Sequence, residues 1–291
     1  MKAAIDLGSN MAQLLIIDDQ QREKIFQQFT SLGEGTFASN KLSDAAIARA
    51  LKVLAEFIDI LKAHKINPLE VVFCATEACR RATNREDFFK IITKLGFKPK
   101  LLNGQQEAFL GCLGAMSQLV NPSLDYVSMD IGGASTEIAI LDTNCELHKY
   151  ISLKVGTLAV TQWLKNSQLK ENLEKIKSEH TNDLIDFQGK TLICTRGTMT
   201  SLFNIALDNR EVEEKSFHGS QLSPTELIKR LKVIQSFTHE QLIQKYSYLD
   251  KRLPTLDAGI EIFLFICELL KPKQVILSER GLAHGALIDT K

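Results

Sequence analysis

Length, composition and charge exclude several classes of protein. The chain has 291 residues, and its 35 Lys and Arg balance 35 Asp and Glu, so no whole-protein field attracts DNA, RNA or an anionic membrane. Its 44% hydrophobic and 24% charged residues exclude a disordered or collagen-like chain, and at about 150 residues per domain the length predicts two domains.

The first predicted element is a β-hairpin. Residues 2–18 read as two apolar strands joined by a polar turn, DLGSN, at 6–10. Gly33 and Gly35 mark a later turn. Ser43 then caps a long predicted helix whose apolar side chains recur at alternating steps of four and three. That helix presents one apolar face to a core.

The next elements lead to a predicted linker. A strand at 71–73 follows Pro68, and a polar turn-and-helix segment then carries Arg80, Arg81 and Arg85. A helix is predicted over 105–119. Two helix-unfriendly residues and a serine at 121–123 separate it from the next strand.

The second half continues the alternation of strands and helices. Strands are predicted at 126–129, 138–141 and 191–194, and helices at 165–186, from Pro224, and at 258–270. The highly charged helix at 165–186 is interpreted as a solvated surface helix without a function. The pattern predicts an α/β fold with domains at 1–120 and 121–291.

Residues 4–18 and 128–142 align without a gap, which indicates an internal duplication. Asp6 meets Asp130, Gly8 meets Gly132, and Gln13 meets Glu137. In such a hairpin a strand ends in a carboxylate, and the glycine turn exposes backbone N–H groups that can bind phosphate oxygens. A carboxylate beside the turn can hold hydrated Mg²⁺. One such turn alone is more simply structural, whereas two in register favour the functional interpretation.

The cysteines and histidines do not suggest a metal or redox site. Most cysteines lie in apolar runs, no CxxC pair is present, and no two histidines are spaced by one helical turn. We interpret the cysteines as small buried hydrophobic residues. They are Cys74, Cys79, Cys112, Cys145, Cys194 and Cys267.

Motifs along nearly the whole chain resemble one family, the exopolyphosphatase/guanosine pentaphosphate phosphohydrolases. Their order and spacing carry the resemblance more than any single motif. They are DLGSN at 6–10, ATEACRRATN at 75–84, GQQEAFLGCLGA at 104–115, DIGGASTE at 130–137, SLKVGT at 152–157, RGTMTSL at 196–202, FHG at 217–219, the region 252–259, and SERGLAHGAL at 278–287.

The resemblance implies two actin-like ATPase (ribonuclease H-like) domains with an active cleft between them. It implies a Mg²⁺-dependent phosphohydrolase that releases terminal phosphate from inorganic polyphosphate or from guanosine pentaphosphate. The apolar C-terminal helices allow a homodimer. Because the chain shows neither a signal-peptide layout nor an apolar stretch of about 18 residues, we expect a cytoplasmic protein with no membrane and no DNA partner.

The resemblance also assigns roles to residues. Glu107 matches the family's catalytic glutamate and would direct the attacking water, and Arg80 would contact phosphate oxygens. The metal would be held by Asp130, Glu137 and Asp6. Backbone or hydroxyl donors for phosphate would come from Ser9, Asn10, Gly133, Ser135, Gly197 and Thr198. A tight turn with Thr198 as a helix N-cap is the structural alternative for the last pair, and His218 is left outside the catalytic set.

Several residues depart from the family pattern. They cluster at the proposed cleft. Gln13 and Phe109 stand where the family has basic residues, Ala134 replaces a glycine, and Cys194 and Arg196 interrupt a glycine-rich loop to which Arg196 could restore a positive charge. The other departures are Met11 for serine, Gln106 for glutamate, and Ala283 and His284 for Arg-Glu. These changes keep a second hypothesis open, a catalytically weak or inactive relative that binds polyphosphate or a nucleotide. A third, an actin-like kinase, rests on the fold alone. The sequence leaves the choice of substrate, the preferred chain length and the oligomeric state undecided.

Overall fold

The computed structural model describes residues 1–210, 217–250 and 252–290, and it divides into two compact units. The first contains residues 1–114 and 282–291, and the second contains residues 115–281. The predicted domains 1–120 and 121–291 differ from these units mainly at the carboxyl terminus. The terminal helix, residues 282–289, belongs to the first unit because its apolar side chains pack on that unit's sheet.

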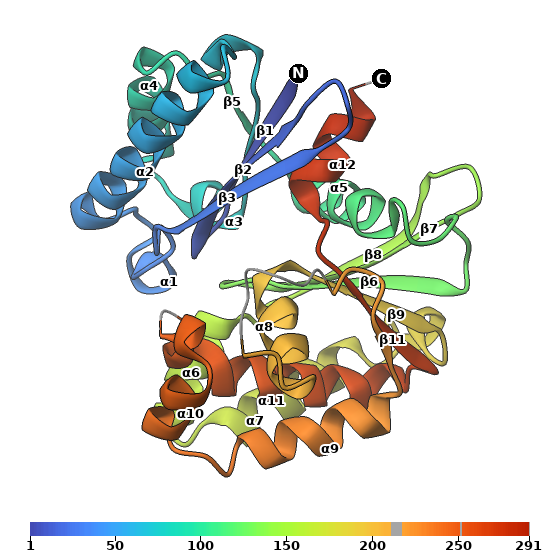
Figure 1. The fold of residues 1–291 in the computed structure, drawn as a ribbon. Coiled ribbons are helices and arrows are strands. Elements are labelled where there is room, and N and C mark those ends of the chain that lie inside the picture. The colour runs from blue at the N-terminus through green and yellow to red at the C-terminus, as the bar shows by residue number, and fades with distance from the viewer. Residues whose placement is uncertain (211–216, 251, 291) are drawn as a thin grey trace. The chain divides into compact units, whose positions relative to one another are not determined.

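The first unit is built on a five-stranded mixed sheet (Figure 1). Its strands are β1 (Lys2–Leu7), β2 (Met11–Ile17), β3 (Glu23–Phe29), β4 (Val72–Ala75) and β5 (Pro99–Leu101), in the order β3-β2-β1-β4-β5. Its helices are α1 (Thr36–Ser39), α2 (Asp44–Ala63), α3 (Glu77–Arg81), α4 (Arg85–Lys94), α5 (Gly104–Met116) and α12 (Leu282–Asp289), with a 3₁₀ turn at Pro68–Glu70. Strands β1, β2 and β3 are antiparallel, whereas β4 and β5 run parallel to β1.

Each face of this sheet has its own helices. On one face Ile5, Leu14 and Phe73 pack with the apolar side of α2 and with α3 and α4. On the other face Ala4 and Cys74 belong to clusters completed by α5 and α12. Because side chains alternate along a strand, Asp6 points to the face that α5 and α12 cover.

The second unit is built on a six-stranded sheet. Its strands are β6 (Tyr126–Ile131), β7 (Thr136–Leu141), β8 (Leu147–Leu153), β9 (Thr191–Thr195), β10 (Gln221–Leu222) and β11 (Gln274–Ser278), in the order β10-β11-β9-β6-β7-β8. Its helices are α6 (Thr157–Lys165), α7 (Leu169–His180), α8 (Arg196–Ala206), α9 (Pro224–Ile234), α10 (His239–Lys245) and α11 (Leu253–Leu270), with 3₁₀ turns at Ile185–Phe187 and Ser247–Leu249.

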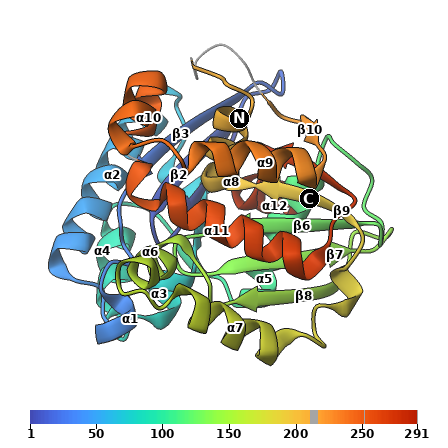
Figure 2. The same cartoon turned by 90° about the horizontal axis from the view of Figure 1, so that it is seen from below.

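One large core fills the helix-covered face of the second sheet. The strand residues Met129, Ile138 and Leu192 join the buried face of α11 in this core, and Figure 2 shows α9 and α11 running side by side across the sheet. Asp130 alternates with the core residues Met129 and Ile131, so its side chain points to the opposite face.

The strand orders explain the internal duplication. In each sheet, three consecutive antiparallel strands are followed by parallel strands. The order β8-β7-β6-β9-β11 in the second sheet therefore corresponds to β3-β2-β1-β4-β5 in the first, and β10 is an additional edge strand. Asp6 pairs with Gln13 across the first hairpin as Asp130 pairs with Glu137 across the second. The same turn hydrogen bond closes both, from Gly8 N to Met11 O and from Gly132 N to Ser135 O, each at 2.9 Å. The α/β fold with two actin-like domains is therefore confirmed.

Most local predictions are confirmed, and some need correction. The Ser43 hydroxyl accepts from Ala46 N at 3.2 Å and caps α2, as predicted. The predicted helix at 165–186 is wrong at both ends, because α6 closes at Lys165 and α7 covers only Leu169–His180. Between them Ser167 has a φ of 57°, which breaks the helix.

Five of the six cysteines are buried, as predicted, and all six are free thiols. Burial raises the pKa of Cys79 and Cys267 to about 12, so these thiols stay protonated and unreactive. Cys145 is the exception and is exposed. Within the described residues, no helix has both the length and the apolar character that crossing a membrane requires.

Candidate functional site

The carboxyl-terminal edge of the first sheet gathers three of the sequence motifs. Strands β1, β4 and β5 are parallel and neighbouring, so their carboxyl ends lie on one edge. The motif at 6–10 spans the end of β1, and the segments 76–81 and 102–107 follow β4 and β5. Thr76 N donates to Leu7 O at 3.3 Å and ties the first two together. Open α/β sheets bind ligands at this edge.

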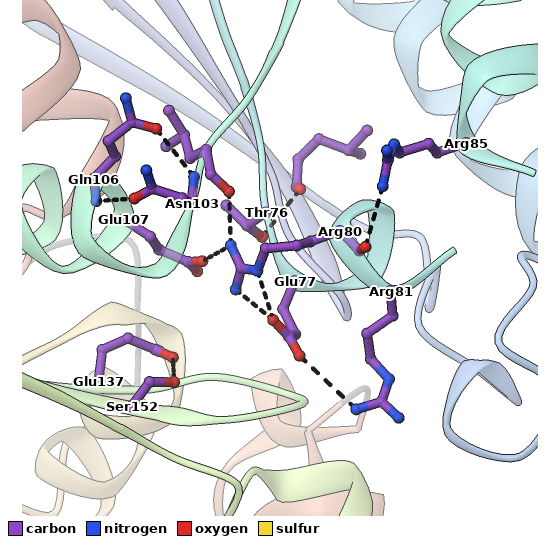
Figure 3. A network of polar contacts seen from close by, with 12 residues as sticks. Thr76, Glu77, Arg80, Arg81, Arg85, Asn103, Gln106, Glu107, Glu137 and Ser152 are labelled. Atoms are coloured by element: carbon purple, nitrogen blue, oxygen red, sulfur yellow. Dashed lines mark hydrogen bonds and ion pairs between the residues drawn. The ribbon is translucent and has the colours of Figure 1, made fainter. Parts of the chain in front are cut away.

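Arg80 is the centre of a polar network at this edge (Figure 3). Its Nη1 donates to Leu102 O at 2.7 Å and to Glu107 Oε2 at 3.1 Å. Its Nε donates to Glu77 Oε2 at 2.9 Å, and its Nη2 donates to the same oxygen. Burial lowers the pKa of Arg80, but the carboxylates of Glu107 and Glu77 outweigh it, so the pKa is raised. The structure thus joins the two residues predicted as catalytic, Arg80 and Glu107.

Asp6 lies at the same edge, and its side chain points to the face of the sheet that α5 covers, the helix that carries Glu107. Burial raises the pKa of the neighbouring Cys74 to about 12, and the charges of Asp6 and Glu107 act in the same direction. Both carboxylates are therefore close enough to act on one thiol. Asp6 is only 6% exposed, as is Glu107.

A capping box determines how α5 presents Glu107. Asn103 Oδ1 accepts from Gln106 N at 2.8 Å, and Gln106 Oε1 accepts from Asn103 N at 3.0 Å. Because glutamine and glutamate serve equally at this position of a capping box, the departure of Gln106 from the family pattern keeps the start of the helix intact.

The capping box predicts two different effects on stability. We expect Asn103→Ala to lower the free energy of unfolding by about 1 kcal/mol, because the backbone N–H of Gln106 at the helix start loses its acceptor, Asn103 Oδ1. Gln106→Glu should change it by less than about 0.5 kcal/mol. Urea denaturation of both variants measures this, and equal losses in the two would contradict the capping role.

The second sheet presents a pair of carboxylates at its corresponding edge. Asp130 and Glu137 lie directly opposite each other on β6 and β7, and each is 7% exposed. The Ser152 hydroxyl donates to Glu137 Oε1 at 3.0 Å (Figure 3). Two carboxylates placed opposite each other repel, and a bound cation would offset that repulsion. This donor set fits Mg²⁺, which keeps several waters and takes few protein ligands.

Backbone hydrogen bonds fix each hairpin turn to a segment farther along the chain. That segment follows β3 in the first unit and β8 in the second. In the second unit Thr157 N donates to Gly132 O at 3.0 Å and Leu158 N to Gly133 O at 2.9 Å. A Cβ at Gly156 would lie 2.4 Å from the backbone of Ala134, so α6 can approach the turn only through a glycine. In the first unit Gly33 N donates to Ser9 O at 2.7 Å.

The remaining turn candidates lie in these two turns. Asn10 O accepts from Thr30 N and Ser31 N, both at 3.0 Å, so the first turn is fixed at this residue too. Ser135 is 3% exposed, and Gly133 is half-buried. These candidates therefore stay a prediction for phosphate binding, on turns that the structure holds in place.

Gly197 and Thr198 lie in the first turn of α8, after β9, at the same edge as Asp130. Thr198 is not the N-cap of this helix: α8 begins at Arg196, and the Thr198 hydroxyl donates to Ile131 O at 3.1 Å. That contact fixes α8 to the end of β6, whose last residue is Ile131.

Arg252 is a site residue that the sequence analysis matched to the family without giving it a role. A Cβ at Gly197 would lie 2.1 Å from its Nη2, so the guanidinium lies directly on the start of α8. Burial lowers the pKa of Arg252 to about 10. An arginine followed by Leu-Pro at the start of an apolar helix is a sequence signal that could have found it.

The departures from the family pattern find different explanations. Ala134 does not have a positive φ, so its Cβ causes no left-handed backbone strain where the family has a glycine. Phe109 is partly buried and packs against the apolar cluster of Cys74 and Leu110. Ala283 packs on β1 and β2 in the same manner.

The other departures are mostly structural. His284 is 1% exposed, and its Nε2 lies 3.2 Å from Glu23 Oε2. Gln13 accepts from Gln27 Nε2 at 3.2 Å across two strands of the meander. Cys194 is a buried residue of β9. The side chain of Arg196 lies outside the described residues.

The site residues thus form two sets, one at each sheet edge. Glu107, Arg80, Asp6, Ser9 and Asn10 belong to the first unit. The second unit carries Asp130, Glu137, Gly133, Ser135, Gly197 and Thr198. Within the described part of the chain, no three His, Cys, Asp or Glu side chains cluster as a ready-made metal cage.

Comparisons with known proteins agree with this arrangement. Exopolyphosphatase 2 of Mycobacterium tuberculosis strain H37Rv is 26% identical over 269 residues, which cover 82% of this chain and 81% of that protein. A bifunctional 3-dehydroquinate synthase/phosphatase of Fusobacterium nucleatum is 26% identical over 310 residues. That match covers 99% of this chain but 46% of the relative, so the chain spans less than half of that protein's length.

Solved structures match over the whole chain. An exopolyphosphatase-like protein has a TM-score of 0.87 at 25% identity, with 99% of this chain and 98% of that chain covered. A Ppx/GppA protein of Aquifex aeolicus has a TM-score of 0.76 at 26% identity, with 99% and 96% covered. The model of the Ppx/GppA phosphatase family itself matches residues 20–291. Because this model covers all but the first 19 residues, the chain belongs to the Ppx/GppA phosphatase family.

Proposed function

We propose that this protein is a Mg²⁺-dependent phosphohydrolase that releases terminal phosphate from inorganic polyphosphate. The observation that carries the proposal is the buried Glu107 carboxylate, held by Arg80 at the carboxyl edge of a sheet whose strand β1 carries Asp6 as its penultimate residue. The relatives named exopolyphosphatase support the choice of substrate. Guanosine pentaphosphate has the same terminal phosphoanhydride and is the second substrate to be tested.

Glu107 directs the attacking water in this proposal. Its carboxylate accepts a hydrogen bond from the water and takes its proton as the water oxygen bonds to the terminal phosphorus. The bond from that phosphorus to the bridging oxygen breaks, and the shortened chain leaves with the bridging oxygen. The Arg80 hydrogen bond at 3.1 Å keeps the carboxylate in one orientation during this step.

The second unit supplies candidate metal ligands and candidate donors for phosphate oxygens. Asp130 and Glu137 would hold Mg²⁺ together with water and substrate oxygens. Asp6 is the corresponding carboxylate of the first unit and a further candidate metal ligand. A bound Mg²⁺ neutralises the charge on phosphate oxygens. Backbone N–H groups of Gly133 and of the start of α8, with the nearby Arg252 guanidinium, would bind the remaining phosphate oxygens.

Metal removal tests the proposal directly. We expect phosphate release from tripolyphosphate and long-chain polyphosphate with Mg²⁺, loss of release in excess chelator, and recovery when Mg²⁺ is added back. Guanosine pentaphosphate is assayed in parallel to rank the substrates. Release that ignores the chelator would remove the metal from the proposal. Binding of the polyphosphates without any release would instead identify a non-catalytic relative, the interpretation that the apolar Phe109 favours.

A further inference from the structure

The phosphate-binding side of Arg80 is already occupied in this structure. An arginine binds an oxyanion most strongly through two parallel N–H···O hydrogen bonds. In Arg80 the pair formed by Nε and Nη2 donates to one oxygen of Glu77, Oε2. The other terminal nitrogen, Nη1, donates to Leu102 O and to Glu107. A substrate phosphate that uses the Nε and Nη2 pair therefore meets the Glu77 carboxylate first.

The charges around Arg80 balance before any substrate arrives. The carboxylates of Glu77 and Glu107 face the guanidinium groups of Arg80 and Arg81. Glu77 is 5% exposed, so its charge is poorly screened by solvent. A polyanionic substrate thus finds no excess of positive charge in this network.

Arg81 offers Glu77 a second partner. Its Nη1 lies 3.9 Å from Glu77 Oε1, the carboxylate oxygen that Arg80 does not contact. A small rotation of the Glu77 side chain toward Arg81 would shorten this ion pair and uncover Nε and Nη2 of Arg80. The carboxylate can therefore leave Arg80 without losing all of its positive partners.

We propose that Glu77 is an internal competitor of substrate phosphate: its carboxylate occupies the Nε and Nη2 pair of Arg80 and moves toward Arg81 when a phosphate group binds. This inference rests on the proposed function, which places substrate phosphate on Arg80. It assigns Glu77 a role in setting affinity for phosphate, and Arg81 the role of receiving the displaced carboxylate.

The test is the affinity for inorganic phosphate and tripolyphosphate, measured by titration calorimetry at constant ionic strength with Mg²⁺ present. Glu77→Gln keeps the size and an acceptor oxygen but removes the competing charge. We expect it to bind both ligands about tenfold more tightly than the unaltered protein. A residue that only supports the fold would not tighten binding when it is altered. The double variant Glu77→Gln/Arg80→Ala should lose the gain, because the gain acts through Arg80.

Glu86→Gln is the matched control. Glu86 is on the neighbouring helix α4, its side chain is 71% exposed, and it pairs with Arg85 at 3.1 Å. Glu86→Gln removes one negative charge, as Glu77→Gln does, at a side chain that does not contact Arg80. We therefore expect less than a twofold change in the affinity for phosphate and tripolyphosphate. If Glu86→Gln raised the phosphate affinity as much as Glu77→Gln, the change in net charge alone would explain the effect, and the inference would be overturned.

Glu77→Asp keeps the test decisive if Glu77→Gln does not fold. It retains the charge but shortens the side chain, so the contact with Nη2 is lost and binding should tighten to a smaller extent. Unchanged or weaker phosphate binding in both variants overturns the inference. The proposed function is tested separately, by polyphosphate hydrolysis with the unaltered protein. Phosphate affinity that is unchanged in Arg80→Ala would contradict both.

Discussion

Glu107→Gln is expected to lower kcat for polyphosphate hydrolysis by about a thousandfold, since positioned acid–base groups contribute roughly 10²–10⁴ in rate. The glutamine keeps the shape of the side chain and can still accept from Arg80 Nη1, so the network around Arg80 should persist. It cannot take the proton of the attacking water. Phosphate release is measured at saturating substrate, with thermal unfolding to show that the fold is intact.

Glu56→Gln on the exposed face of α2 is the control for this substitution. It makes the same chemical change in the same unit but far along the chain from the network, and we expect an unchanged kcat. If Glu107→Gln released phosphate at more than about a tenth of the unaltered rate, another group would have to direct the water. A contaminating phosphatase would show the same rate in all variants.

Gly285→Ala is expected to cause the largest loss of stability among single-atom additions. A Cβ at Gly285 would lie 1.8 Å from Leu110 O and 2.7 Å from Leu110 C, so α12 and α5 must separate. Overpacking of this kind costs about 3 kcal/mol, because a backbone atom cannot move aside as a flexible side chain can. Leu110 is one helical turn after Glu107, so the shift also displaces the proposed catalytic carboxylate.

Gly111→Ala is the matched control for Gly285→Ala. It adds the same methyl group to α5 itself, where nothing lies within 4 Å of the new Cβ. Alanine has a higher helix propensity than glycine, so we expect Gly111→Ala to raise the free energy of unfolding by about 1 kcal/mol. Calorimetric unfolding of the two variants should therefore give shifts of opposite sign. A loss in Gly285→Ala no greater than in Gly111→Ala would show that α12 does not pack closely on α5.

The resemblance between residues 4–18 and 128–142 predicted more than a shared motif. It predicted that both segments form hairpins of one design, with Asp6 equivalent to Asp130 and Gln13 to Glu137. In the structure Asp6 pairs with Gln13 and Asp130 with Glu137, so the two hairpins have equivalent registers. This was possible because a hairpin is local: its strands, turn and register depend on residues close together in the chain.

Other elements carried too weak a local signal. The strand β3 has the sequence EKIFQQF and lies at the edge of its sheet, where exposed polar side chains are tolerated and little apolar alternation is needed. β8 is the corresponding edge strand of the second unit and was missed for the same reason. Secondary structure at a sheet edge is decided by the neighbouring strand.

The sequence by itself determined the α/β class, the duplicated hairpins with their carboxylates, and the family, because these depend on local pattern and on the order of motifs. Only the tertiary structure decided the partners of each charge. It joined Arg80 to Glu77, Leu102 and Glu107, placed Arg252 on Gly197, and returned α12 to the first unit. Such contacts join residues up to hundreds of positions apart, and packing selects them from many chemically equivalent alternatives.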